Sequence, residues 1–159
     1  MAFSPTVLCN NILKRSFSEN VPVTPMKLQK LLYFVSCEYL KCTDTPLLSE
    51  SFEVWQYGPV LPSVYNEFKS FRSSPITTFA KDANGGSFAY QEDTAPNLKN
   101  ALDAVWSCFK ERTGVQLSRI THEDGSGWSN AFQNRENTIS EERMKADTTY
   151  EKYMSNGKS

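Results

Sequence analysis

The sequence has few of the residues that commonly build metal centres. It contains one histidine, His122, and four cysteines, none of them in a C-x-x-C pair. Structural zinc sites usually combine Cys and His ligands at short, regular spacings. A zinc site made of Cys37, Cys42 and His122 stays open as an alternative, although the spacing of the two cysteines fits it poorly. We interpret the cysteines as small packing residues and expect no metal or cofactor.

Long apolar runs and an excess of either charge are also absent. No run approaches the ~20 apolar residues of a membrane-spanning helix. The first residues lack the basic start and apolar stretch of a secretory signal. The formal net charge of −1 gives no overall attraction to nucleic acid or to an anionic membrane. These absences favour a cytoplasmic protein with free thiols and no membrane partner.

Signatures of catalysis are scarce as well. The glycines of residues 84–87 are not followed by a helix with a lysine, so they indicate a turn rather than a phosphate-binding loop. His122 lies beside Glu123 and Asp124, which would orient an imidazole acting as the base for a cysteine nucleophile. No local signature supports such a pair, and we favour a histidine that tethers a loop by hydrogen bonds. An enzyme that uses His122 with a cysteine nevertheless stays open as an alternative.

Helical patterning is what the sequence does contain. Hydrophobic residues make up 39% and aromatic residues 13% of the 159 residues, enough to bury a core in one domain. Ser4-Pro5 and Thr24-Pro25 are typical helix starts. We expect a single domain over residues 1–159, mainly α (α+β), with about five to six helices and a small antiparallel β element. The expected helices cover residues 5–17, 25–42, 115–122 and 140–154, with two more that begin at Pro62 and near Pro96, and residues 155–159 are expected to be a frayed tail.

The β element is predicted from three short segments. Residues 52–57 alternate in polarity, and residues 76–80 and 87–91 flank a hairpin turn signal at Asn84-Gly85-Gly86. Gly58-Pro59 is expected to end the first strand and to set the turn into the next helix. Two further boundary signals are a helix stop at Gly114 and a capping box from Thr138 to Glu141.

Several aromatic residues stand in polar or turn-rich contexts. Trp55, Tyr57, Tyr65 and Trp128 are of the types enriched at protein interfaces, although they also suit the sealing of a small core. Both interpretations stay open. Binding to DNA through a winged-helix shape is less favoured because no helix is strongly basic, although one edge could hold Lys27, Lys30, Lys41, Lys69 and Arg72.

Three segments of the chain form a specific combination when they are taken in order. They are TPMKLQKLLYFVSCEYL (24–40), FEVWQYGPVLPSVYNEF (52–68) and LSRITHEDGSGWSNA (117–131). Together they resemble the Panacea domain, the SocA-like antitoxin family that also occurs as phage- and prophage-associated proteins. The resemblance extends over most of the chain, roughly residues 5–154.

The resemblance implies a mainly helical domain that neutralises a toxin encoded beside it, by direct protein–protein contact and without catalysis. The implied partner is a cognate toxin, and delivery of that toxin to a host protease is a second mechanism that the resemblance permits. Two other functions stay open. One is a phage- or prophage-encoded inhibitor of a host defence protein, and the other is a DNA-binding regulator of its own operon.

The resemblance rests on motif positions that form the candidate partner-binding or motif site. They are Lys27–Phe34, Val60 and the eight residues Trp55, Tyr57, Gly58, Pro59, Tyr65, Thr121, His122 and Trp128. A motif shared by domains that face unlike toxins favours a common scaffold, so we expect partner specificity in residues 72–95 and in the C-terminal helix. Gly127 before the tryptophan predicts a loose loop. We predict that the side chains of Leu28, Leu31, Leu32, Val60 and Tyr65 are mostly buried.

Overall fold

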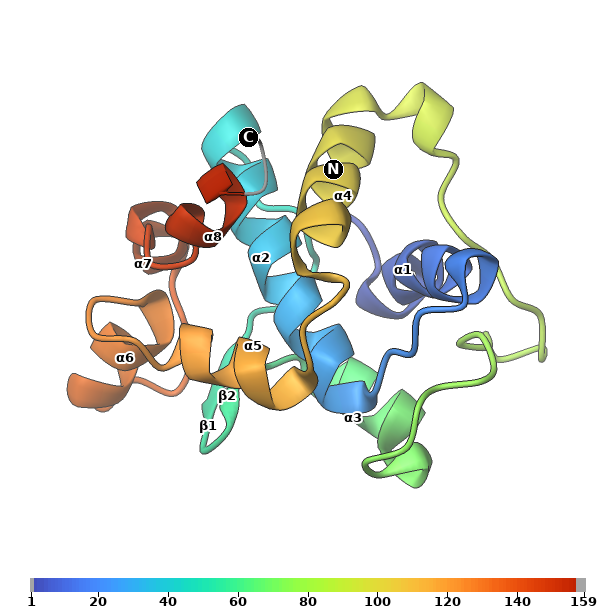
Figure 1. The fold of residues 1–159 in the computed structure, drawn as a ribbon, viewed down its shortest axis with the longest axis horizontal. Coiled ribbons are helices and arrows are strands. Elements are labelled where there is room, and N and C mark those ends of the chain that lie inside the picture. Colours follow the sequence, from blue (N-terminus) through green and yellow to red (C-terminus); the bar gives the residue numbers. More distant parts are fainter. Residues whose placement is uncertain (1, 157–159) are drawn as a thin grey trace.

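Helices dominate the computed structural model of the chain, which describes residues 2–156 (Figure 1). The α-helices are α1 (Pro5–Glu19), α2 (Pro25–Thr43), α3 (Pro62–Phe68), α4 (Pro96–Phe109), α5 (Gly114–Thr121), α6 (Gly127–Gln133), α7 (Glu141–Ala146) and α8 (Glu151–Asn156). Two 3-10 helices, Lys69–Phe71 and Glu92–Thr94, and one hairpin of β1 (Glu53–Trp55) and β2 (Gly58–Val60) complete the described elements. The predicted mainly α fold with a small antiparallel β element is confirmed, and the described residues form eight α-helices rather than five to six.

Helix α2 runs through the centre of the molecule, and α1, α3, α4, α5 and α7 pack against it (Figure 1). It begins where the sequence predicts, because the Thr24 hydroxyl accepts a hydrogen bond from the Lys27 amide and a proline takes the first helical position. The predicted burial of Leu28, Leu31 and Leu32 is confirmed. This helix therefore supplies the middle of the hydrophobic core.

The antiparallel element is a tight hairpin and not the three-segment sheet predicted. Strands β1 and β2 are joined by a two-residue turn at Gln56 and Tyr57, so Gly58-Pro59 belongs to the second strand and is not the turn into a helix. Pro59 lies opposite Val54, whose amide donates instead to the Asn137 carbonyl on the other side of β1. A proline fits there because its missing N–H is not needed for the pairing.

Residues 76–91 do not form the two strands predicted there. Their backbone bonds to two buried asparagine side chains of α1: Asn10 accepts from and donates to Ala80, and Asn11 accepts from and donates to Tyr90. Each side-chain amide supplies the donor and the acceptor that a neighbouring strand would otherwise offer. A pattern of alternating polarity does not reveal such a partner.

The predicted helix of residues 140–154 is divided into α7 and α8. Asp147 separates them, and its buried carboxylate accepts hydrogen bonds from Thr149. The capping box predicted at Thr138 is wrong, because Thr138 forms a β-bridge to Glu53 and Ser140 caps α7 instead. Of the predicted frayed tail, residues 157–159 lie outside the described residues, and residues 155 and 156 continue α8.

Gly114 was expected to stop a helix, and it begins one. Helix α4 ends at Phe109, and Thr113 with Gln116 forms a capping box at the start of α5. A Cβ atom at Gly114 would lie 3.0 Å from the Lys27 backbone nitrogen, so a glycine lets α5 start against the first turn of α2. None of the helices in the described part of the chain is both long and apolar enough to cross a bilayer.

Candidate functional site

The motif segments meet around a buried lysine, Lys30 on α2. Its side chain is 1% exposed, and its ammonium nitrogen Nζ lies 3.1 Å from the carbonyl oxygen of Pro59 in β2. Among the described residues no other hydrogen-bond acceptor and no carboxylate pairs with this nitrogen. Burial lowers the pKa of Lys30 to about 7, because the charged form loses its hydration. Lys30 therefore links the hairpin to α2 by one hydrogen bond, and its amine loses its hydration in doing so.

Gly58 allows the hairpin to approach the two helices behind it. Its φ angle is 118°, and a Cβ atom there would lie 2.8 Å from the Thr121 hydroxyl and 2.9 Å from Cε of Lys30. Both the positive φ angle and the lack of room for a Cβ atom favour glycine at this position. Thr121 is itself buried and donates to the carbonyl of Ser118 at 2.7 Å. The predicted residues Gly58, Pro59 and Thr121 thus come together in one buried junction.

His122 lies at the end of α5 and contacts the turn of the hairpin. Its Nδ1 is 2.6 Å from the Ser118 carbonyl, and its Nε2 is 2.8 Å from the Gln56 carbonyl. Carbonyl oxygens only accept, so both contacts are hydrogen bonds only when both ring nitrogens carry hydrogen. The Ser118 hydroxyl adds a third link by donating to the Tyr57 carbonyl at 2.6 Å. Helix α5 therefore holds the backbone of the turn in place.

Trp128 on α6 forms the buried centre of a group of rings. Its Nε1 donates to the Trp55 carbonyl at 2.8 Å, and its ring lies 4.0 Å from that of His122. Phe132 stacks on it with ring centroids 5.0 Å apart, and Trp55 in turn contacts Tyr65 edge-on, also at 5.0 Å. The rings thus form two groups, Trp55 with Tyr65 and Trp128 with His122 and Phe132, and the hydrogen bond from Trp128 to the Trp55 backbone joins them.

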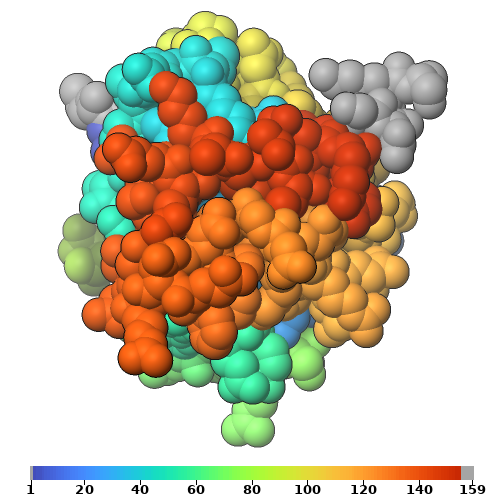
Figure 2. All heavy atoms as spheres, turned by 90° about the vertical axis from the view of Figure 1, so that its left-hand side faces the viewer, coloured from blue at the N-terminus to red at the C-terminus, as the bar shows by residue number. Residues whose placement is uncertain are grey.

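Three aromatic side chains on the hairpin turn, α3 and α6 reach solvent. Tyr57, Tyr65 and Phe132 are 60%, 45% and 58% exposed, and Tyr65 contacts the half-buried Trp55 while Phe132 stacks on the buried Trp128. We call these five residues the aromatic surface. Figure 2 shows its setting, with α6 in orange lying against the teal hairpin. Exposed rings fixed on hydrogen-bonded elements are typical of interface anchors.

Two outcomes here differ from what the sequence predicts. Tyr65 is not buried, because it lies on the outward face of α3 against Trp55, whereas Val60 is buried as predicted. Phe132 was missed, although it stands four residues after Trp128, a spacing that places both rings on the same side of a helix.

Gly127 was expected to loosen the loop before Trp128, and it is instead closely packed. It is the first residue of α6, and its amide donates to the buried Asp147 carboxylate at 2.9 Å. A Cβ atom there would lie 2.4 Å from the Tyr33 hydroxyl, which donates to the same carboxylate at 2.6 Å. Asp147 is the second residue that sequence reasoning missed, and it anchors α6 to α2.

The alternatives based on cysteine chemistry gain no support from the geometry. All four cysteines are free, Cys37 is buried and Cys42 is exposed, and the described residues hold no cluster of His, Cys, Asp or Glu suited to a metal ion. Burial raises the pKa of the Cys9 and Cys37 thiols, since it disfavours the thiolate. Such thiols are weak nucleophiles.

The basic edge considered for DNA binding is not formed. Lys27 and Lys30 are buried and donate to backbone carbonyls, and Lys41 pairs with Glu151 at 3.0 Å. Of the five basic residues, only Lys69 and Arg72 are exposed. Three of the five positive charges that the sequence suggested along one edge therefore bind groups of the same chain.

Comparison with known proteins assigns the chain to a family. Residues 28–129 match the family model described as antitoxin SocA-like, Panacea domain. The chain belongs to this family. It is also similar to Antitoxin SocA of Caulobacter vibrioides, with 27% identity over 124 residues, which cover 76% of this chain and 66% of that relative. No solved structure gives a significant match.

The matched region of the Panacea domain contains all eight predicted site residues. It therefore includes the junction around Lys30, the tethered hairpin turn and Trp128. Phe132 and Asp147 lie beyond it. The aromatic surface thus combines four rings from inside the matched region with one ring, Phe132, from outside it.

Proposed function

We propose that the protein is an antitoxin that neutralises a cognate toxin by direct protein–protein contact, without catalysis. The observation that carries this proposal is the aromatic surface, in which three exposed rings lie on elements that are hydrogen-bonded to one another around Trp55 and Trp128. Large rings at the centre of an interface supply much of its binding energy, and a complex of this kind typically buries about 1,600 Å². Membership of the SocA-like antitoxin family supports a toxin as the partner.

The junction beneath the aromatic surface prepares it for binding. Lys30, Ser118 and His122 each bond to a backbone carbonyl of the hairpin, so the hairpin backbone is held at three points. A surface that is ordered before binding loses less conformational entropy when the complex forms. The buried motif residues therefore act as the scaffold, and the exposed rings above them act as the contacts.

Residues 72–95 remain a second region where partner specificity is expected. They carry Phe88, which is 64% exposed and lies on a segment held by α1, away from the hairpin. A toxin that contacts Phe88 but not the aromatic surface would place the binding site on the other region. The two regions are separable by single substitutions.

The proposal is tested by co-expressing the chain with the product of the neighbouring gene. Wild-type protein is expected to restore growth and to co-purify with that product. The double variant Tyr57→Ala with Phe132→Ala is expected to fold normally, as judged by its thermal midpoint, and to lose both effects. Val115→Ala, which removes another exposed apolar side chain, is the matched control and should behave as wild type. Absence of any complex with wild-type protein would refute the antitoxin function.

A further inference from the structure

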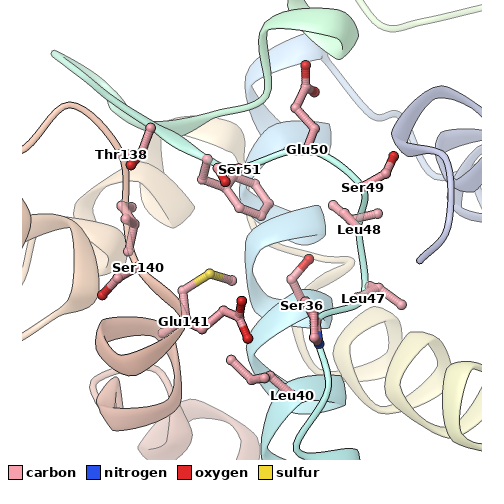
Figure 3. Close-up of a pocket in the computed structure, with 14 residues that line it drawn as sticks. Ser36, Leu40, Leu47, Leu48, Ser49, Glu50, Ser51, Thr138, Ser140 and Glu141 are labelled. Carbon is pink, nitrogen blue, oxygen red and sulfur yellow. The ribbon is translucent and has the colours of Figure 1, made fainter. Parts of the chain in front are cut away.

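A cavity of about 350 Å³ lies on α2 between the loop before β1 and the start of α7. It is separate from the junction around Lys30, and Figure 3 shows its lining side chains from residues 47–51 on one side and residues 138–141 on the other. Its volume is within the range of pockets that hold a small ligand or one large side chain.

The cavity has an apolar floor and a polar rim. Buried apolar side chains form its floor: Leu40, Leu47, Leu48, Phe52, Ile139 and Met144. Exposed hydroxyl groups of Ser49, Ser51, Thr138 and Ser140 lie at its rim. An occupant that combines an aliphatic part with several hydrogen-bond donors would match this lining.

Ser36 on α2 contributes an unsatisfied group to the cavity. Its side chain is 3% exposed. Among the buried side-chain nitrogen and oxygen atoms of the described residues, its hydroxyl oxygen alone has no hydrogen-bond partner. A buried polar group without a partner costs about 1–3 kcal/mol, so such atoms are uncommon. Figure 3 shows Ser36 facing the space between the two lining segments.

The charges around the cavity are all negative. Glu141 points across it toward α2 (Figure 3), and within the described residues its carboxylate forms no ion pair or hydrogen bond. The second lining carboxylate, Glu50, accepts from the hydroxyl of Ser63 at 2.6 Å. No Lys, Arg or His of the described residues lines the cavity. The complementary occupant therefore carries positive charge.

We propose that this cavity is a socket for an arginine side chain of a protein partner. The aliphatic stem would pack on Leu47 and Met144, and the guanidinium would donate to the Ser36 hydroxyl and the Glu141 carboxylate. Arginine suits the site better than lysine, because it offers five donors in a plane and is less strongly hydrated. That the partner is a toxin rests on the proposed function, whereas the socket itself follows from the lining residues.

The test is an NMR titration of the isotopically labelled full chain with N-acetyl-arginine methylamide. Its neutral counterpart, N-acetyl-citrulline methylamide, has nearly the same shape and is the ligand control. We expect saturable amide shift changes at residues 47–51 and 139–141 with the arginine compound alone. Glu141→Gln should weaken its binding about fivefold or more, because a charge-assisted hydrogen bond is lost. Glu142→Gln removes the neighbouring charge, does not line the cavity, and should have no effect.

Three results would overturn the socket. They are the absence of saturable shifts at these residues, an equal response to the citrulline compound, and equal weakening by Glu141→Gln and Glu142→Gln. Because the titration uses the free chain, its outcome is independent of whether a toxin complex forms. Failure of the proposed antitoxin function and failure of the socket are thus separate results.

Discussion

A buried amine with a single acceptor is the least expected residue-scale feature of this fold. Lys30 lies within the region that matches the family model, yet its side chain is buried. Periodicity alone places a lysine on the solvent side of an amphipathic helix, and the sequence therefore suggested a basic edge. The acceptor, Pro59, stands 29 residues away in the hairpin, so only the three-dimensional structure accounts for the burial.

The lowered pKa of Lys30 predicts a specific dependence of stability on pH. It is about 7 in the folded chain, against an ordinary value of 10.5. Between these values the unfolded chain holds more protons on this side chain, so the free energy of unfolding rises with pH. Below pH 7 the cost of burying the charge is fully present. Urea unfolding at several pH values should show wild type gaining several kcal/mol relative to Lys30→Met between about pH 7 and 10.

The comparison with Lys30→Met controls for other groups that titrate in this range, since both proteins contain them. Parallel stability curves for the two proteins would show that Lys30 keeps an ordinary pKa, and the described junction would then be wrong.

Gly58 offers a second residue-scale test. Replacing it with alanine should lower the free energy of unfolding by more than about 2 kcal/mol, because the new Cβ meets Thr121 and Lys30 at a positive φ angle. Gly85→Ala is the control, since Gly85 also has a positive φ but a Cβ atom added there would meet nothing within 4 Å. It should cost only about 1 kcal/mol. Equal losses would indicate that backbone conformation alone decides the effect.

At the scale of elements, the long helices were predictable and the irregular segments were not. The signals at Thr24 and the leucines of α2 follow from local spacing, which a helix satisfies by itself. The hairpin and residues 76–91 depend on distant partners, such as Asn137 beside β1 and Asn10 on α1. The exposed position of Tyr65 was missed for the same reason, because its neighbour Trp55 is on another element.

The asparagine side chains of α1 lead to a prediction for the segment that they hold. Asn10→Ala and Asn11→Ala should each lower the free energy of unfolding by about 2 kcal/mol, because buried backbone groups lose their partners. Amide hydrogen exchange at Ala80 and Tyr90 should speed up in the corresponding variant. Asn66→Ala, on the exposed face of α3, is the control. Unchanged exchange in both variants would contradict the described anchoring.

At the scale of the whole molecule, three motif segments far apart in the sequence close around one junction. Helix α2 supplies Lys30, the hairpin supplies Gly58 and Pro59, and α5 supplies Thr121. The sequence indicated that these segments belong together through their resemblance to a family, but not that polar side chains such as Gln29, Lys30 and Thr121 are buried where the segments meet. The division between buried scaffold and exposed rings is a property of the fold.

The dissociation constant of the purified complex is the best test of whether the aromatic surface binds the toxin. It should be measured by calorimetry with the product of the neighbouring gene for wild type, Tyr57→Ala, Phe132→Ala and Phe88→Ala. We expect Tyr57→Ala and Phe132→Ala to bind at least about tenfold more weakly than wild type, and Phe88→Ala to bind as wild type. Wild-type affinity in both Tyr57→Ala and Phe132→Ala would contradict this expectation.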